Sequence, residues 1–364
     1  MTLVSHIVRL RLRNQKLVRS ELRKPEDVVA WLGAVQSQDY PAAKWALGLR
    51  AAGVTDAGVE QAFSAGAILR SHVLRPTWHF VAPADIRWIL SISGPRVHAM
   101  NAPYYRKMGL DSRAFARGRA AIARALEGGN QLTRTELASA LERRGIVADG
   151  MRLAYLVMHA ELDGVICSGG RRGNQITYAL LEERVPPARR LDRDEALAAL
   201  TSRYFSSRGP ATVRDYVWWS GLTTRDARAG IEMNRSTLEQ QVMDGRIFWS
   251  VPSRVPAAPR NPVVYLLPNY DEYGIAYRDR DVIPGVERAR TISSTEEFAH
   301  LLVVDGELVG RWSRTQKIST MVVEAQPFRR LTKVEKQALD AAAARYGKFL
   351  QMPVTLTFAQ GSAR

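Results

Sequence analysis

The 364-residue sequence contains a single cysteine, Cys167. One thiol cannot form an intrachain disulfide, which argues against a disulfide-stabilised secreted fold and fits a reducing, cytoplasmic compartment. The run around it is apolar, so we expect a buried structural thiol. No stretch has the uninterrupted apolar length of a membrane helix, and Arg9 and Arg11 interrupt the apolar N-terminus. The sequence therefore predicts a soluble protein that does not enter membranes.

Several familiar catalytic motifs are also missing. The six histidines, at positions 6, 72, 79, 98, 159 and 300, show no metal-ligand spacing, and one cysteine cannot build a zinc knuckle. There is no phosphate-binding loop and no glycine-rich dinucleotide fingerprint after a strand. The nucleophile elbow of serine hydrolases is absent as well. We therefore expect neither a metal nor any other cofactor.

Acidic residues are scarce relative to basic ones. Lysine and arginine total 52 against 36 aspartate and glutamate, which gives a net charge of +16 and an isoelectric point near 10.3. Excess positive charge favours polyanions, because neutralised phosphates release condensed counterions. The charge favours a nucleic-acid partner, although a basic surface can also serve solubility alone.

The middle of the chain has the clearest local pattern. Residues 133–136 form a capping box that opens a helix running to Gly145, and a second helix with apolar residues near a 3.6 period ends at residues 163–164. Strands 165–168 and 175–180 follow, joined by a glycine-rich loop at 169–174. This order is typical of a winged helix-turn-helix. Arg171 and Arg172 on the loop are predicted to contact DNA phosphates, though winged helices also bind proteins and loop arginines are often only solvated.

Similar but looser patterns flank this unit. A helix from Pro25 and a hairpin around Arg75-Pro76 precede it, and helices follow the break at Pro186-Pro187. Strands near 263–267, 301–304 and 308–312 and a helix at 332–349 close the chain. We predict an α+β fold of about three tandem winged helix-turn-helix motifs with a C-terminal β-rich segment. The expected domains are 1–115, 116–185 and 186–364.

One short polar segment, Gln36-Ser37-Gln38-Asp39-Tyr40, ends the first apolar helix pattern. Gln36 and Gln38 alternate, so in a non-helical turn both amides would point the same way. By itself the segment is a weak signal, since glutamines at a helix end usually bond only to water or backbone.

Several longer segments resemble one protein family. They are 31–40, 45–50, 74–81, 218–222, 266–273 and 304–312. The resemblance covers nearly the whole chain, because these segments are distributed along most of its length. The sequence is similar in these segments to the HTH_42 winged-helix family, which includes the AlkZ-like and YcaQ-like DNA glycosylases. The AlkZ-like branch carries Gln-x-Gln and the YcaQ-like branch Gln-x-Asp, and Gln36-Ser37-Gln38 matches the former. The resemblance implies three winged-helix motifs around a basic channel, a monomer, and excision of alkylated bases, including unhooking of antibiotic-derived interstrand crosslinks.

The implied chemistry is physically coherent. Alkylation at N7 of a purine makes the base cationic and a good leaving group, so the enzyme need not supply a strong acid. An amide oxygen can hold the attacking water and direct its dipole at the developing sugar cation. The resemblance thus assigns Gln36 and Gln38 to catalysis. Asp39 is a rival general base, but a capping or salt-bridge role is favoured for it.

Further site residues follow from their position in the matched segments. Arg75 and His79 are predicted to contact DNA, with a structural role an equal alternative for His79. The residues predicted to line the lesion site are Asp39, Tyr40, Trp78, Tyr270 and Asp271. The acidic-aromatic run at 270–273 could instead form a structural network with Arg278 and Arg280, and this alternative is slightly favoured.

The partner implied is double-stranded DNA carrying alkylated purines, in a cytoplasmic, nucleoid-associated enzyme. The alternative function is a non-catalytic winged-helix DNA-binding protein or transcription regulator, which would bind undamaged DNA sequence-selectively and release no base. A third reading is a scaffold for another protein, whose DNA binding would collapse steeply with salt.

Overall fold

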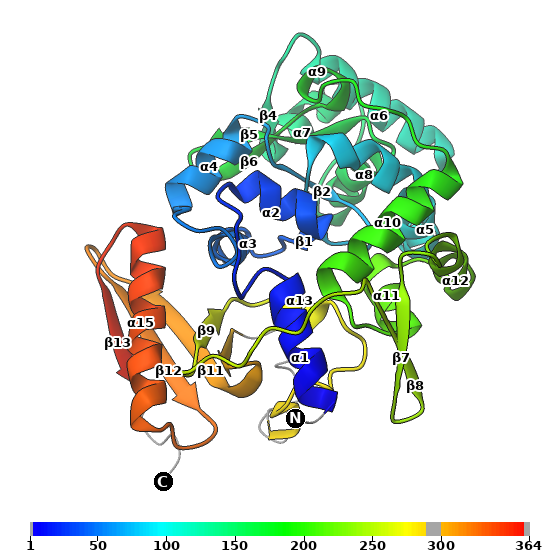
Figure 1. Cartoon of the computed structure of the whole chain (residues 1–364). Helices are drawn as coiled ribbons and strands as arrows, with labels where there is room; N and C mark the ends of the chain where they lie inside the picture. The colour runs from blue at the N-terminus through cyan, green and yellow to red at the C-terminus, as the bar shows by residue number, and fades with distance from the viewer. Residues whose placement is uncertain (1–2, 289–299, 360–364) are drawn as a thin grey trace.

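The computed structural model describes residues 3–288 and 300–359. It is a mixed α+β fold whose elements fall into three consecutive parts, with a C-terminal sheet and helix at one side (Figure 1). No helix in the described part of the chain is both long and apolar enough to cross a bilayer.

The first part builds a small sheet between helices. Its elements are α1 (Leu3–Asn14), α2 (Pro25–Leu32), β1 (Ala34–Gln36), α3 (Tyr40–Gly48), α4 (Asp56–Ser64), β2 (Leu69–His72), β3 (Trp78–Val81) and α5 (Pro83–Lys107). The strands are antiparallel in the order β1-β3-β2. The hairpin around Arg75-Pro76 is confirmed, whereas α1 was not predicted.

The helix before the glutamine segment ends earlier than the apolar pattern predicted. Val35 was expected to continue it, but α2 ends at Leu32 and Ala34–Gln36 is strand β1. Gly33 is the reason, since its φ of 76° lies in the left-handed region that glycine adopts without strain. Gln36 therefore stands on a strand and not on a helix.

The second part repeats the same sheet topology. Its elements are α6 (Ser112–Leu126), β4 (Leu132–Thr133), α7 (Arg134–Glu142), α8 (Gly150–Leu162), β5 (Ile166–Arg172), β6 (Gln175–Leu180) and α9 (Leu181–Arg184). The strand order is β4-β6-β5. The capping box of Thr133 and Glu136 is present. Cys167 is buried in β5, and burial raises the pKa of its thiol to about 12, as expected for a structural thiol.

The predicted wing loop at 169–174 is shorter in the structure. Strand β5 continues through Arg172, and only Gly173 and Asn174 separate it from β6. The register of the β5–β6 pairing shifts between Ser168 and Arg171, so β5 continues across the two glycines between them. The expected domain boundary at 115/116 falls inside α6, and the division into 1–115, 116–185 and 186–364 remains a prediction.

The third part combines three helices with a hairpin and leads into the C-terminal sheet. Its elements are α10 (Arg193–Arg208), α11 (Val213–Ser220), α12 (Thr224–Met233), β7 (Glu239–Met243), β8 (Arg246–Ser250), β9 (Val264–Leu267), α13 (Glu272–Ile275), β10 (Leu301–Val304), β11 (Glu307–Gln316), β12 (Met321–Pro327), α15 (Lys333–Leu350) and β13 (Val354–Phe358). The five C-terminal strands run in the order β13-β12-β11-β10-β9, with only β12 and β13 parallel. The predicted turn at Asp305-Gly306 joins β10 to β11.

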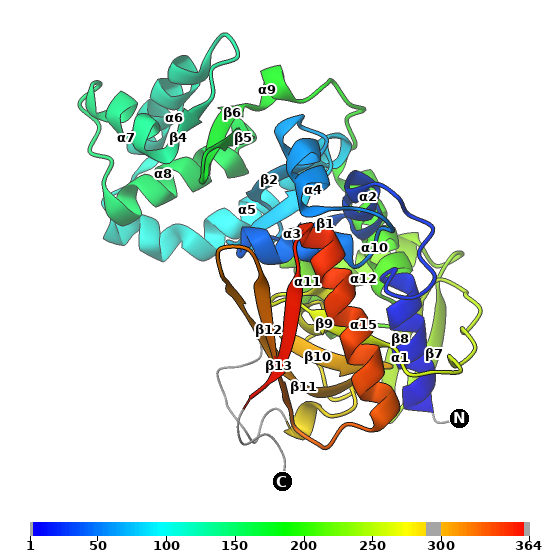
Figure 2. The same cartoon turned by 90° about the vertical axis from the view of Figure 1, so that its left-hand side faces the viewer.

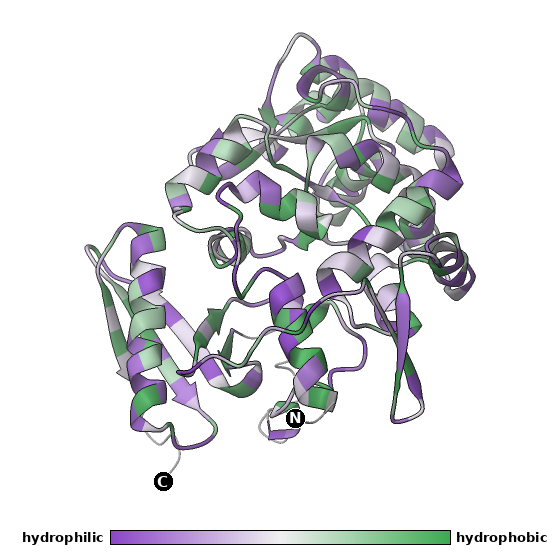
Figure 3. Ribbon diagram, in the orientation of Figure 1, coloured by the Kyte–Doolittle hydropathy of each residue, from purple (hydrophilic) through white to green (hydrophobic). Residues whose placement is uncertain are grey.

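The described residues form three large hydrophobic cores and a small fourth one between α1 and the β7–β8 hairpin. The first core joins α2 and α3 to the C-terminal sheet and α15, with Trp45 packed on Tyr346 and Phe349. A second core joins the sheet β1-β3-β2 and α5 to α10–α12, and a third lies within the second part and the end of α5. Helix α15 shows alternating hydrophilic and hydrophobic residues, as expected for a helix with one packed face (Figure 3). The first part of the chain therefore packs against two distant regions, the C-terminal sheet with α15 and the helices α10–α12.

Candidate active site

Gln36 is the last residue of β1, and nearly all of it is buried, with 8% exposed. Its backbone N–H donates to Glu272 Oε1 at 3.2 Å, and its side-chain Oε1 accepts from Arg75 Nη2 at 3.3 Å. A guanidinium can only donate, which fixes the amide with its oxygen toward Arg75. One glutamine of the motif is therefore held in a defined orientation.

Gln38 lies beyond the strand in the short connection to α3 and is exposed. Within the described residues no hydrogen bond restrains its side chain. The two glutamines thus share one segment but differ in environment, a distinction that alternation in the sequence does not reveal. Gln38 is the one whose amide is accessible to solvent.

Asp39 acts as the N-cap of α3, accepting from Ala42 N at 3.0 Å. Its other carboxylate oxygen accepts from Asn269 Nδ2 at 3.1 Å, and Arg314 lies 3.8 Å away. The capping and ion-pair role favoured from the sequence matches these contacts. Asn269 and Arg314, from distant segments, were not predicted to lie here.

Tyr40 follows directly and anchors the segment to the first core. Its ring packs edge-on against Phe63 and Phe80 at centroid distances of 5.2 and 5.6 Å. Its hydroxyl donates to Glu60 Oε1 at 3.2 Å, and burial together with Glu60 raises its pKa far above 10. Arg171 of β5 pairs with Glu60 at 3.1 Å and lies over the Tyr40 ring, so the second part contacts the glutamine segment.

The hairpin between β2 and β3 brings Arg75 to Gln36. Leu74 has a φ of 63°, and its carbonyl oxygen would lie 2.4 Å from a Cβ placed on Gly221. Only glycine at position 221 permits this approach of the third part. The Arg75 guanidinium also lies 6.0 Å from the Trp218 ring. Arg75 is half-buried, so its predicted DNA contact is compatible with its bond to Gln36.

His79 pairs with Gln36 across β1 and β3 and is completely buried. Its Nδ1 bonds to the Thr77 carbonyl oxygen at 2.9 Å. Burial, strengthened by the charge of Arg75, holds its pKa well below 6.5, so the ring is neutral. The structural alternative raised from the sequence suits this setting better than direct DNA contact does.

Trp78 faces the other side of the same sheet and is half-buried. The Arg70 guanidinium lies 4.4 Å from its ring, and the His72 ring is 4.5 Å away. Arg70 also donates to the carbonyl oxygen of Ser37, within the glutamine motif, at 3.0 Å. Trp78 therefore supports the glutamine motif indirectly, through its contact with Arg70.

The acidic-aromatic run at 270–273 forms a buried network. Asp271 makes two hydrogen bonds to Arg50, at 2.7 and 2.9 Å, and Glu272 Oε2 accepts from Arg208 at 2.6 and 2.8 Å. These two arginines were not predicted as partners, whereas Arg280 donates to the carbonyl oxygen of Gly274, directly after the run, at 2.8 Å. The side chain of Asp271 has no exposed surface, which favours the structural role over lining of the lesion site.

Glu272 links this network to the motif. It contacts the Gln36 backbone, Arg208 and the Trp219 indole, which donates at 3.1 Å. Tyr270, with a φ of 58°, begins the turn that presents the two carboxylates. Glu272 was noted in the sequence only as part of a cluster, because its partner Gln36 is 236 positions away.

The two wing arginines are paired in the structure. Arg172 bonds to both oxygens of Glu136 at 2.7 and 2.9 Å, and Arg171 pairs with Glu60. Arg172 is exposed, so a phosphate could replace Glu136 as its partner. DNA contact by either arginine remains a prediction.

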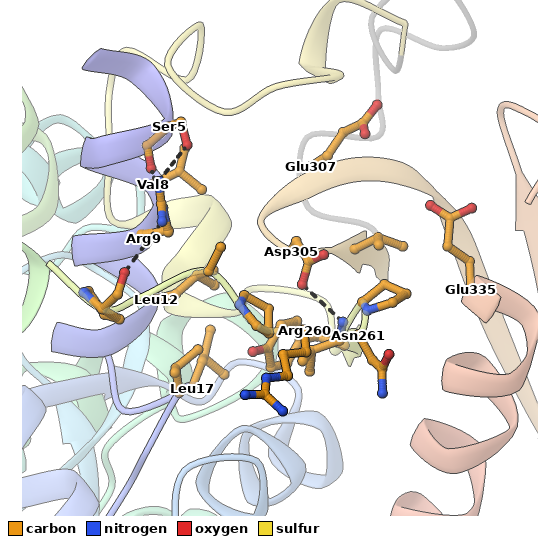
Figure 4. A pocket seen from close by; sticks show the side chains of 18 of the residues that line it. Ser5, Val8, Arg9, Leu12, Leu17, Arg260, Asn261, Asp305, Glu307 and Glu335 are labelled. Atoms are coloured by element: carbon orange, nitrogen blue, oxygen red, sulfur yellow. Dashed lines mark hydrogen bonds between the residues drawn. The ribbon is translucent and has the colours of Figure 1, made fainter. Parts of the chain in front are cut away.

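A large cavity lies apart from all of these residues. It measures about 1140 Å³ and lies between α1, the proline-rich loop at 256–262 and the start of α15 (Figure 4). Its wall contains Leu12, Asp305 and Glu335 but no residue predicted for catalysis or DNA contact. We assign it no part in the chemistry of the glutamine site.

Comparisons with known proteins agree with this fold and identify the family. A family model described as "DNA glycosylase AlkZ-like" matches residues 29–349. An interstrand DNA cross-link repair glycosylase from Streptomyces sahachiroi is 23% identical over 353 residues, covering 93% of this chain and 94% of that protein. The structure of the Streptomyces sahachiroi DNA glycosylase AlkZ is similar with a TM-score of 0.78 at 22% identity, covering 97% of this chain and 99% of that one.

The class of protein is thus a DNA glycosylase, an enzyme that releases bases from DNA. The chain belongs to the AlkZ-like DNA glycosylase family, whose model spans nearly all of the described residues.

Proposed function

We propose that this enzyme hydrolyses the N-glycosidic bond of N7-alkylated purines in duplex DNA and unhooks interstrand crosslinks made through such bases. The name of the Streptomyces relative supports the crosslink substrate. The observation that carries the proposal is the pairing of an oriented, buried Gln36 with an exposed Gln38 two residues on. That arrangement fixes one amide and offers the other to a substrate.

In this proposal the side-chain amides of Gln36 and Gln38 have different roles. Gln38 holds the attacking water through its side-chain oxygen, while Gln36, locked by Arg75, keeps the segment in register. The dipole of a neutral amide stabilises the developing sugar cation without needing a proton transfer.

DNA binding is proposed to use three winged-helix units, one in each consecutive part of the chain. The matching strand orders β1-β3-β2 and β4-β6-β5, each preceded and interrupted by helices, support the first two, and α10–α12 with the β7–β8 hairpin supports the third. Exposed arginines on α6 and after α7 offer phosphate contacts: Arg113, Arg117, Arg124, Arg143 and Arg144. We further propose that the enzyme acts as a monomer associated with the nucleoid.

The test is base release from a duplex containing N7-methylguanine, read as strand cleavage after alkali at the abasic site. Gln38→Ala is expected to slow single-turnover release about 100-fold or more while DNA affinity is kept. Gln337→Ala removes an equally exposed glutamine from α15 and should change neither quantity. A duplex crosslinked through two N7 atoms then tests unhooking on a denaturing gel.

If the Gln36→Ala, Gln38→Ala double variant released the base as fast as the wild-type protein, these two glutamines would not be the catalytic residues. Sequence-selective binding of undamaged DNA by a wild-type protein that releases no base would instead identify a regulator.

A further inference from the structure

Three potential metal ligands from two segments that are distant in the sequence meet where α5 contacts α8. His98 comes from α5, and His159 and Asp163 come from the end of α8. One ligand atom from each lies within 4.8 Å of the other two. The spacing of the histidines predicted no metal site, because this cluster joins two segments about 60 residues apart.

The individual distances are close to those a bound ion requires. His98 Nε2 lies 3.1 Å from Asp163 Oδ1, and His159 Nδ1 lies 3.2 Å from Asp163 Oδ2. A tetrahedral ion with bonds of about 2 Å places its ligand atoms about 3.3 Å apart. Small rotations of the side chains therefore suffice to bring all three onto one ion.

The surroundings orient both imidazoles as ligands. The Tyr105 hydroxyl lies 3.1 Å from His98 Nδ1, so an Nδ1–H donated to it leaves the Nε2 lone pair facing Asp163. The His159 ring stacks on Phe115 with a centroid distance of 3.8 Å, which fixes its plane. Such outer contacts are typical of histidines that hold a metal.

Access and electrostatics also suit a cation. The side chains of His98, His159 and Asp163 keep 24%, 16% and 22% of their surface exposed. A cavity of about 370 Å³ is lined by His98 and Asp163 and leaves room for a water as fourth ligand. The site lies at the C-terminal end of α8, where the helix dipole favours positive charge.

The geometry points to a binding site for one divalent transition-metal ion of the Zn²⁺ class, held by His98, His159 and Asp163. Its role is structural, since it would clamp α5 to α8 where the two helices lie close. At this contact a Cβ on Gly94 would lie only 2.9 Å from the Leu162 carbonyl oxygen. The ion would thus fix the second part of the chain against the first.

One neighbouring cation competes with the metal. Arg119 of α6 contacts Asp163 Oδ2 and shares its charge. A salt-bridge cluster without metal would need this arginine, whereas a bound ion would be weakened by it. The Arg119→Gln variant therefore distinguishes a metal site from a salt-bridge cluster without metal.

The experiment is calorimetric titration of chelator-treated protein with Zn²⁺, supported by the visible spectrum of the Co²⁺ form. We expect one ion per chain with a dissociation constant near or below about 1 µM and a rise in melting temperature. His98→Gln and His159→Gln should weaken binding about 100-fold or more, and Tyr105→Phe about tenfold. His6→Gln, which removes a histidine from α1, should leave the affinity unchanged.

Arg119→Gln is expected to tighten Zn²⁺ binding about tenfold, because it removes a positive charge beside the ion. If His98→Gln does not fold by circular dichroism, Tyr105→Phe and Arg119→Gln carry the same test. The proposal is overturned if the wild-type protein binds no stoichiometric Zn²⁺, or if the ligand variants bind it equally well.

Discussion

The first and second sheets of this enzyme share one topology and differ in what they carry. In both, a short edge strand pairs with the last strand of a hairpin, in the orders β1-β3-β2 and β4-β6-β5. They also touch, since Arg70 N on β2 donates to Ser168 Oγ on β5 at 2.8 Å (Figure 2). The same strand order therefore occurs in two adjacent sheets that carry different side chains.

The difference lies in one row of side chains across each sheet. In the first sheet the row is Gln36, His79 and Ser71, all buried and polar. In the second it is Leu132, Tyr178 and Ser168. Among the residues that the structure describes, a buried carboxylate from the third part of the chain, Glu272, reaches the first sheet and none reaches the second. The first sheet thus differs from the second in its buried polar edge residue, Gln36, and in the remote carboxylate that holds it.

The largest expected effect tests that remote partner. Glu272→Gln leaves the buried charge of Arg208 unpaired and should cost about 3–5 kcal/mol of unfolding free energy, measured by urea denaturation. Glu136→Gln breaks the exposed pair with Arg172 at the second sheet and should cost far less. Equal losses in the two variants would contradict the contrast between the sheets.

A smaller effect separates catalysis from binding. Arg75→Ala releases the Gln36 amide and should slow single-turnover base release about tenfold or more, with a lesser change in affinity for unmodified duplex. Arg172→Ala should weaken duplex binding and reduce the salt slope by about one, with the release rate kept. The contrast is lost if both arginines affect rate and affinity alike.

The smallest effect is a pH dependence specific to the first sheet. The pKa of His79 is well below 6.5 in the folded protein, so on acidification the unfolded chain takes up this proton first. The stability that depends on neutral His79 is present above pH 6.5 and falls, as pH drops below 6.5, by at most about 1.4 kcal/mol per pH unit. His79→Asn should remove this loss in urea titrations between pH 7.5 and 4.5.

Tyr178 provides the matched control, because it occupies the corresponding central position of the second sheet. Burial raises the pKa of Tyr178 above 10, so Tyr178→Phe should not alter how the free energy of unfolding changes with pH below 6.5. An unchanged slope in His79→Asn would show that His79 does not titrate as described.

Local signals predicted much of the fold. The capping box at Thr133 and the turn at Asp305-Gly306 act over a few residues, and the structure has both. The end of α2 at Gly33 was also a local event, but the apolar residue Val35 beyond it suits a buried strand as well as a helix. The arginine-rich helix α6 was not identified, although its apolar residues are spaced along one face.

The candidate site was predictable only in part. Family resemblance selected Gln36 and Gln38, yet which one is buried depends on Arg75 and Glu272, and their bonds to Gln36 span 39 and 236 positions. The partners of the two carboxylates in the acidic run were missed for the same reason. Arg278 and Arg280 are near in sequence, whereas Arg50 and Arg208 are near in space. Ion-pair choice in a core follows three-dimensional packing, which a single sequence does not display.

The bond from Glu272 to the Gln36 backbone has a consequence for protein engineering. Grafting the Gln-x-Gln tripeptide onto another scaffold would transfer the side chains without the anchor that holds their strand. A working transplant must carry both the strand and the turn that delivers the carboxylate, together with Arg208 to neutralise it. Chimaeras between relatives should for that reason exchange these segments as one set.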